Sequence, residues 1–117
     1  MSFNSDSSDP FVAKAIELRQ AFHQDAVQRD KLGGRPTEQI RVLKQSGLPS
    51  AQIPVQYGGK GASWLSILRV VREFARTDGS LAHLFGYHHL PLNLVLFRGS
   101  NAQKDHLLRA SAAGNLI

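Results

Sequence analysis

The chain has 117 residues, of which 42% are hydrophobic and 20% charged, and it carries a formal net charge of +5 and no cysteine. This length and composition are typical of one folded domain and not of a disordered chain. The lack of cysteine excludes disulfides and thiolate metal sites and favours a reducing compartment, so we expect a cytoplasmic protein. No apolar run approaches the roughly 20 residues of a membrane span, and no secretion signal opens the chain, so no membrane partner is expected.

The positive charge is distributed along the chain and does not form one basic segment. Only Arg69, Arg72 and Arg76 share a face of a predicted helix. Nucleic-acid binding needs basic side chains gathered on one surface. We therefore expect no nucleic-acid partner, and we interpret the three arginines as a solvated or subunit-facing surface.

The chain is expected to divide into a short arm and one helical domain. Residues 1–9 are rich in Ser, Asp and Asn and predict a flexible N-terminal arm, and residues 10–117 predict the domain. Asp9 before Pro10 is typical of a helix start, because the carboxylate can accept backbone hydrogen bonds and proline fits the first helical position. Apolar residues at three- and four-residue spacing then predict a helix that runs to about Asp30.

A break rich in glycine and proline at residues 32–36 separates this helix from a second, short one. Thr37 can cap the second helix and Gly47 can end it. Proline and several glycines at residues 50–61 predict a compact irregular loop. We interpret its Tyr-Gly-Gly sequence as a tight turn with a structural rather than a catalytic role.

A third helix is predicted to begin near Ser63 and to be apolar on one side only. The side expected to face the core carries Trp64, Ile67, Leu68, Val70, Val71, Phe74 and Ala75. The opposite side, expected to face solvent, carries Arg69, Arg72, Glu73 and Arg76. This pattern is typical of a surface helix of a globular domain.

The predicted fourth helix, residues 80–97, is apolar on two opposite sides. One side carries Leu81, Leu84, Phe85, His88, Leu92 and Val95, and the other carries His83, Tyr87, Leu90 and Leu94. A helix that is apolar on two sides must be covered on two sides, and the other predicted helices can cover only one. The second side therefore requires a partner outside this chain. We expect His88 in a core or interface, and His89 and His106 at the surface.

A fifth helix is predicted from a cap at Asn101 to about Ala112, and residues 114–117 have the pattern of an entry into a strand. The expected fold class is all-α, with about five helices and no sheet. The histidines of the fourth helix lie one, five and six residues apart, whereas helical metal pairs need a spacing of three or four. No metal site is expected.

Two segments of the chain have distinctive sequences. Residues 46–61 end in Ile-Pro-Val-Gln-Tyr-Gly-Gly-Lys-Gly, and residues 71–81 contain Ala-Arg-Thr-Asp-Gly-Ser-Leu and are followed by Gly-Ser-Asn-Ala-Gln-Lys at 99–104. In this order and spacing they resemble the N-terminal helical domain of the acyl-CoA dehydrogenase family. The resemblance implies a domain truncated before a central β-domain and a C-terminal helix bundle, and a homo-oligomer, typically a tetramer, formed through those missing domains. It also implies flavin contacts mostly beyond Ile117, so no cofactor-binding residue is assigned within this chain.

The segment from Asp78 to His88 points to one branch of that family. It resembles the branch of dibenzothiophene monooxygenase and related sulfur-assimilation flavoenzymes, which use reduced flavin and oxygen, and residues 29–34 resemble the same branch. The resemblance implies that His83 and Tyr87 are pocket-lining, candidate catalytic residues beside the flavin. Because they are four residues apart, they share one helical face and can present a ring nitrogen and a hydroxyl to one pocket. The alternative is that both pack at a domain interface and satisfy each other.

The resemblance implies oxidoreductase catalysis by a complete enzyme in which these residues form the N-terminal domain. We expect a reduced-flavin monooxygenase that uses FMN or FAD and acts on a small sulfur- or nitrogen-containing compound, with the 117 residues alone inactive. One alternative is part of an FAD-dependent acyl-CoA dehydrogenase, which the downstream sequence would distinguish. Another is a non-catalytic helical binding or oligomerisation module, which would have to fold stably alone.

Overall fold

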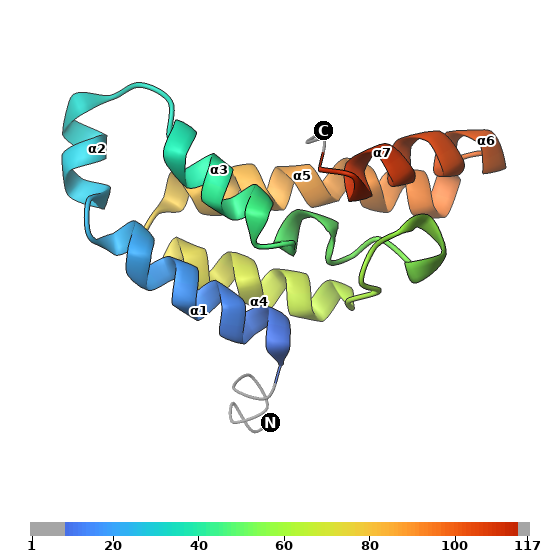
Figure 1. Ribbon diagram of the computed structural model, residues 1–117, viewed down its shortest axis with the longest axis horizontal. Coiled ribbons are helices and arrows are strands. Elements are labelled where there is room, and N and C mark those ends of the chain that lie inside the picture. The colour runs from blue at the N-terminus through green and yellow to red at the C-terminus, as the bar shows by residue number, and fades with distance from the viewer. Residues whose placement is uncertain (1–8, 115–117) are drawn as a thin grey trace.

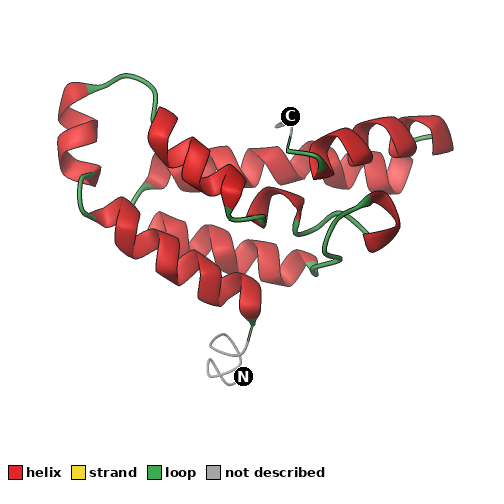
Figure 2. Cartoon of the chain, in the orientation of Figure 1, coloured by secondary structure: helices red, strands yellow, loops and turns green. Residues whose placement is uncertain are grey.

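The computed structural model describes residues 9–114, and all regular structure among them is helical (Figure 1, Figure 2). The all-α class is therefore confirmed. The predicted arm, except for Asp9, and the predicted strand entry beyond residue 114 lie outside the described residues. The α-helices are α1 (Pro10–His23), α2 (Ala26–Leu32), α3 (Thr37–Gln45), α4 (Trp64–Ala75), α5 (Gly79–Arg98), α6 (Asn101–Gln103) and α7 (Arg109–Ala112).

The main core lies where α1, α4 and α5 meet. Helix α4 packs against both α1 and α5, and Figure 1 shows α1 and α4 side by side, with α5 on the side of α3 and α7. Phe22 and Phe74 have ring centroids 5.8 Å apart, and Phe74 and Phe85 have centroids 5.4 Å apart. Tilted and edge-to-face aromatic pairs of this kind contribute about 0.5–1.5 kcal/mol beyond burial. The three rings therefore join the three helices.

A smaller core holds the loop before α4 against the C-terminal half of α5. Ile53 of the loop, Leu92 of α5 and Leu108 are all fully buried there. The loop contains two short 3₁₀ turns, Leu48–Ser50 and Val55–Tyr57, so the predicted irregular loop is confirmed.

The first predicted helix is wrong in its length, because the chain bends after His23 and α2 starts again at Ala26. The Arg29 side chain donates a hydrogen bond of 2.9 Å to the carbonyl oxygen of Phe22. This contact satisfies a carbonyl group near the end of α1. The start of α1 is confirmed, since the Asp9 carboxylate accepts hydrogen bonds from two backbone N–H groups.

At two helix starts, the capping position lies one residue before the residue that was predicted to occupy it. Thr37 is the first residue of α3 and makes no cap, because Pro36 occupies the capping position. Ser100, and not Asn101, caps the last helical segment, and its hydroxyl and the Gln103 side chain each bond the other's backbone N–H. That segment reaches Ala112 as predicted, but it includes a π-helical turn over Lys104–Leu108.

The core-facing side of α4 differs from the predicted one. Trp64 and Leu68 are 36% and 48% exposed, whereas Glu73, predicted to face solvent, is only 4% exposed. Helix α1 packs against α4 at the side that carries Glu73, and Arg19 Nε of α1 lies 3.5 Å from Glu73 Oε2. The ion pair offsets part of the cost of burying a carboxylate.

Candidate functional site

The open face of α5, which we define as His83, Tyr87, Leu90 and Leu94, is exposed along its length. Tyr87, Leu90 and Leu94 are 60%, 48% and 64% exposed, and His83 is exposed as well. The prediction that the other helices of this chain leave this face uncovered is therefore confirmed. Apolar surface of this kind is typical of a binding site or an interface.

His83 and Tyr87 lie together on the open face. Their rings are stacked, with centroids 4.4 Å apart and planes 22° from parallel. Stacking leaves the edges of both rings accessible, so the hydroxyl and a ring nitrogen can both form hydrogen bonds with a molecule placed over α5. The arrangement can hold a polar group or move a proton at this face.

The opposite side of α5 carries two buried histidines. His88 is 2% exposed, as expected for a core residue, and its Nε2 lies 2.8 Å from the carbonyl oxygen of Pro49. His89 is fully buried, and its Nδ1 lies 3.0 Å from Oε1 of Gln52. The prediction of a surface position for His89 is therefore wrong. Its spacing from Phe85, four residues earlier, is the signal that could have indicated burial.

Burial keeps both of these imidazoles neutral. Removal from water lowers the pKa of His88, although its bond to the Pro49 carbonyl opposes the shift. Removal from water, with a smaller effect of the adjacent His88, lowers the pKa of His89 to about 3. The Leu48 carbonyl lies close enough to oppose this shift weakly, but His89 Nε2 makes no hydrogen bond of good geometry. Both rings are therefore neutral hydrogen-bonding groups at pH 7.

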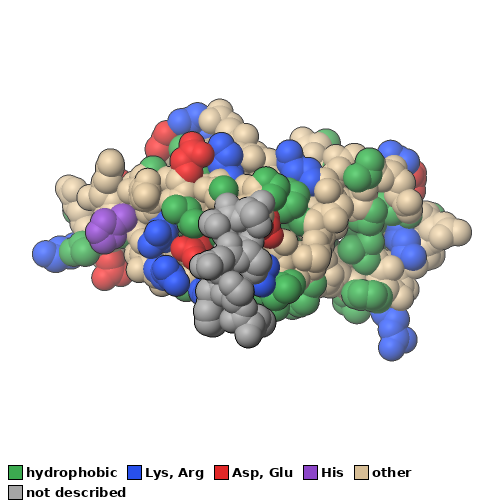
Figure 3. Space-filling view, turned by 90° about the horizontal axis from the view of Figure 1, so that it is seen from below, with side chains coloured by type: hydrophobic (Ala, Val, Ile, Leu, Met, Phe, Trp, Pro, Cys, Tyr) green, Lys and Arg blue, Asp and Glu red, His purple; other side chains and the backbone are tan. Residues whose placement is uncertain are grey.

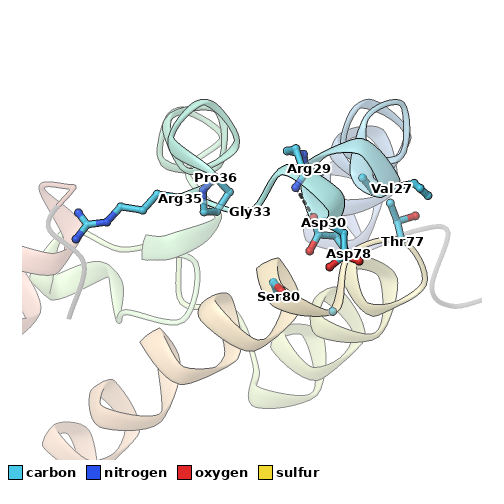
Figure 4. Close-up of a pocket in the computed structure, with 12 residues that line it drawn as sticks. Val27, Arg29, Asp30, Gly33, Arg35, Pro36, Thr77, Asp78 and Ser80 are labelled. Carbon is cyan, nitrogen blue, oxygen red and sulfur yellow. Dashed lines mark hydrogen bonds and ion pairs between the residues drawn. The ribbon is translucent and has the colours of Figure 1, made fainter.

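A groove of about 640 Å³ lies between α2, the following loop and the start of α5 (Figure 4). Arg29 lines it, with Nη1 2.5 Å from Oδ2 of Asp78 and Nε 2.9 Å from Oδ1 of Asp25. The second carboxylate oxygen of Asp78 accepts a hydrogen bond of 3.1 Å from the backbone N–H of Leu81. The groove is lined by residues of both segments that resemble the monooxygenase branch, residues 29–34 and 78–88. The ion pairs of Arg29 hold the start of α5 in place.

We expect Asp78→Ala to lower the free energy of unfolding by about 2–3 kcal/mol, because it removes a helix cap and one charged partner of the partly buried Arg29. Asp78→Ser should recover about 1 kcal/mol, since serine also caps helices. The control is Asp105→Ala, which breaks an exposed pair with Arg109 and should cost at most about 0.5 kcal/mol. Urea denaturation measures all three, and equal losses for the two alanine variants would contradict this role of Asp78.

The charged surface around α1 and α4 has both signs. Figure 3 shows basic and acidic side chains interspersed on this face.

Among residues 9–114, no group of three His, Asp or Glu side chains is arranged to hold a metal ion. Within the same residues, no helix combines the length and the apolar character needed to cross a bilayer.

Comparison with known proteins defines the class of this chain. The acyl-CoA dehydrogenase N-terminal domain model matches residues 10–115. The chain therefore belongs to this family, and the resemblance inferred from its sequence segments is confirmed.

Individual relatives point to the monooxygenase branch. The chain is 46% identical over 112 residues to a dibenzothiophene monooxygenase from Mycolicibacterium goodii, a match that covers 96% of this chain and 27% of that protein. It is 52% identical over 86 residues to a probable FMNH2-dependent monooxygenase, SfnC, from Pseudomonas putida, which covers 74% of this chain and 22% of that protein. A solved complex of TdsC from Paenibacillus sp. A11-2 with FMN and indole superposes with a TM-score of 0.85 and 30% identity over 90% of this chain and 27% of that one. The chain thus spans about a quarter of the length of these relatives.

Proposed function

We propose that this chain is the N-terminal domain of a monooxygenase that uses reduced FMN and oxygen to oxidise a small sulfur- or nitrogen-containing compound. The observation that carries the proposal is the open face of α5, where a His–Tyr pair lies uncovered beside apolar side chains. The similarity to flavin monooxygenases supports the reaction type, and the FMN named for two of the relatives supports FMN over FAD. In the same proposal the complete enzyme is a cytoplasmic homo-oligomer, a tetramer, assembled through further domains.

The residues of the open face fit a flavin placed against α5. Leu90 and Leu94 are exposed and apolar, and such side chains pack well against a flat ring system. The stacked His83 and Tyr87 supply hydrogen-bonding groups next to that apolar surface. When bound, a reduced flavin supplies the electrons that activate oxygen.

The polar and the apolar residues of this face have different roles in the proposal. The Tyr87 hydroxyl donates a hydrogen bond to the reacting oxygen atom, where negative charge develops. The His83 ring orients a polar atom of the substrate or holds a proton for it. Leu90 and Leu94 exclude water from the covered site, which strengthens both hydrogen bonds.

The test is Tyr87→Phe in the complete enzyme, because this change removes one hydroxyl and keeps the ring. Oxygenation should slow by about ten- to a hundredfold, the effect of one hydrogen bond of ~1.5–3 kcal/mol, and product formed per reduced flavin consumed should fall with it. Hydrogen peroxide released per flavin should rise in parallel. Tyr57→Phe is the matched control, since it removes the hydroxyl of the other tyrosine in the chain.

His83→Phe should lower the same ratio, and a melting curve for each variant separates lost function from lost stability. Unchanged coupling in both Tyr87→Phe and His83→Phe would assign the pair to packing alone. Oxidation of acyl-CoA without oxygen would favour a dehydrogenase instead.

A further inference from the structure

Two consecutive buried histidines fasten α5 to the segment that follows α3. His88 Nε2 lies 2.8 Å from the carbonyl oxygen of Pro49, and His89 Nδ1 lies 3.0 Å from Oε1 of Gln52. The amide nitrogen of Gln52 also donates to Oδ1 of Asn93, one turn further along α5. Successive residues of a helix point about 100° apart. The two imidazoles therefore hold α5 from two flanks of its core-facing side.

Hydrophobic burial alone discriminates weakly between the two sides of α5. The buried side includes Leu81, Phe85 and Leu92, and the open face exposes Tyr87, Leu90 and Leu94. If the helix turned about its axis, it would exchange one apolar surface for another, and the hydrophobic effect has no direction of its own. Hydrogen bonds do have direction, so they can select one rotation.

We propose that His88 and His89 are positioning residues, which select the rotation of α5 about its axis and thereby aim His83 and Tyr87 out of the domain. Burying a polar ring costs more than burying a leucine. A specific orientation is an attested reason for keeping a buried polar group in spite of that cost. The inference rests on the proposed function for what the aimed pair does, but not for the rotation itself.

The rotation of α5 matters because the reacting groups lie at its surface. Helical side chains extend roughly 6 Å from the axis, so a turn of about 20° moves their ends by about 2 Å. A misplacement of about 1 Å can lower a catalysed rate by about a hundredfold. A small rotational error would therefore be enough to disable His83 and Tyr87.

The rotation can be measured with single thiols, because the chain has no cysteine of its own. Ala82→Cys places a thiol on the buried side of α5, where Ala82 is 4% exposed, and Leu94→Cys places one on the open face. In the full 117-residue chain, a maleimide should label the Leu94→Cys thiol at least about 100-fold faster, because a buried thiol reacts only during local opening.

The ratio of the two labelling rates, Leu94→Cys over Ala82→Cys, reports the rotation of α5. Adding His88→Leu and His89→Leu together should reduce this ratio at least about tenfold while the chain stays helical and folded, since leucine fills the core without selecting a rotation. His89→Gln should keep the ratio, because glutamine retains a directional hydrogen-bonding group. His106→Leu, at an exposed histidine, is the control for a leucine substitution outside the core.

An unchanged ratio in the double leucine variant would overturn the proposal. So would unfolding of that variant, with both thiols equally reactive, because it would make the histidines stabilising rather than orienting groups. The proposed function is tested by a different result. If the ratio falls but Tyr87→Phe leaves coupling in the complete enzyme unchanged, the positioning role stands and the catalytic role does not.

Discussion

Acidification should destabilise this chain steeply below about pH 6.5, because burial holds His89 neutral. The pKa of this imidazole is lowered from the ordinary value of 6.5 to about 3 by burial and, to a smaller extent, by His88. Between these values the unfolded chain binds a proton that the folded chain does not. The stability that depends on a neutral His89 is therefore fully present above pH 6.5, and it is lost as the pH falls toward 3. The free energy of unfolding should fall by about 1.4 kcal/mol per pH unit, or about 3–5 kcal/mol in total.

Urea denaturation between pH 7 and pH 4 measures this loss. His89→Gln should reduce the slope of the free energy of unfolding against pH by the equivalent of about one bound proton, because glutamine does not titrate in this range. The lowered pKa of His88 acts in the same direction, so part of the dependence should remain. His106→Gln is the control, since its ring is exposed in the folded chain. An undiminished slope in His89→Gln would show that another group causes the acid sensitivity.

Gly59→Ala should lower the free energy of unfolding by about 3 kcal/mol or more, through a steric overlap with backbone. A methyl group at this position would overlap the carbonyl group of Ile53, whose carbon atom would lie 2.5 Å away. Ile53 is fully buried, and its carbonyl oxygen accepts a hydrogen bond from the backbone N–H of Gly61. The loop therefore cannot move aside without breaking its own contacts. Thermal denaturation should show a midpoint about 12 °C lower.

Gly79→Ala is the matched control for this loop substitution. Gly79 is the first residue of α5, and an added methyl group would meet nothing within 4 Å. Because alanine restricts the unfolded chain more than glycine does, this change should be neutral or stabilise by up to about 1 kcal/mol. A midpoint for Gly59→Ala close to that of Gly79→Ala would mean that the loop can repack, and it would remove the structural reason for glycine at position 59.

Local sequence patterns determined the start of α1 and the open face of α5. The cap at Asp9 depends on backbone groups two or three residues away, so a few neighbouring residues were sufficient to predict it. The same applies to the His83–Tyr87 pair, because four-residue spacing places both on one side of any α-helix. The apolar pattern of α5 also predicted a second side that the other helices leave exposed, and the family segments showed which class of domain this is.

Tertiary packing alone decided the burial of Glu73 and His89. Glu73 belongs by its pattern to a solvated side of α4, yet α1 covers it and Arg19 pairs with it. His89 was expected at the surface, yet the segment containing Gln52 closes over it. Arg19 lies far from Glu73 in the sequence and Gln52 lies far from His89, and helical periodicity says only which residues share a side. Which side a neighbour covers depends on how all the helices pack together, and that arrangement set the burial of Glu73 and His89.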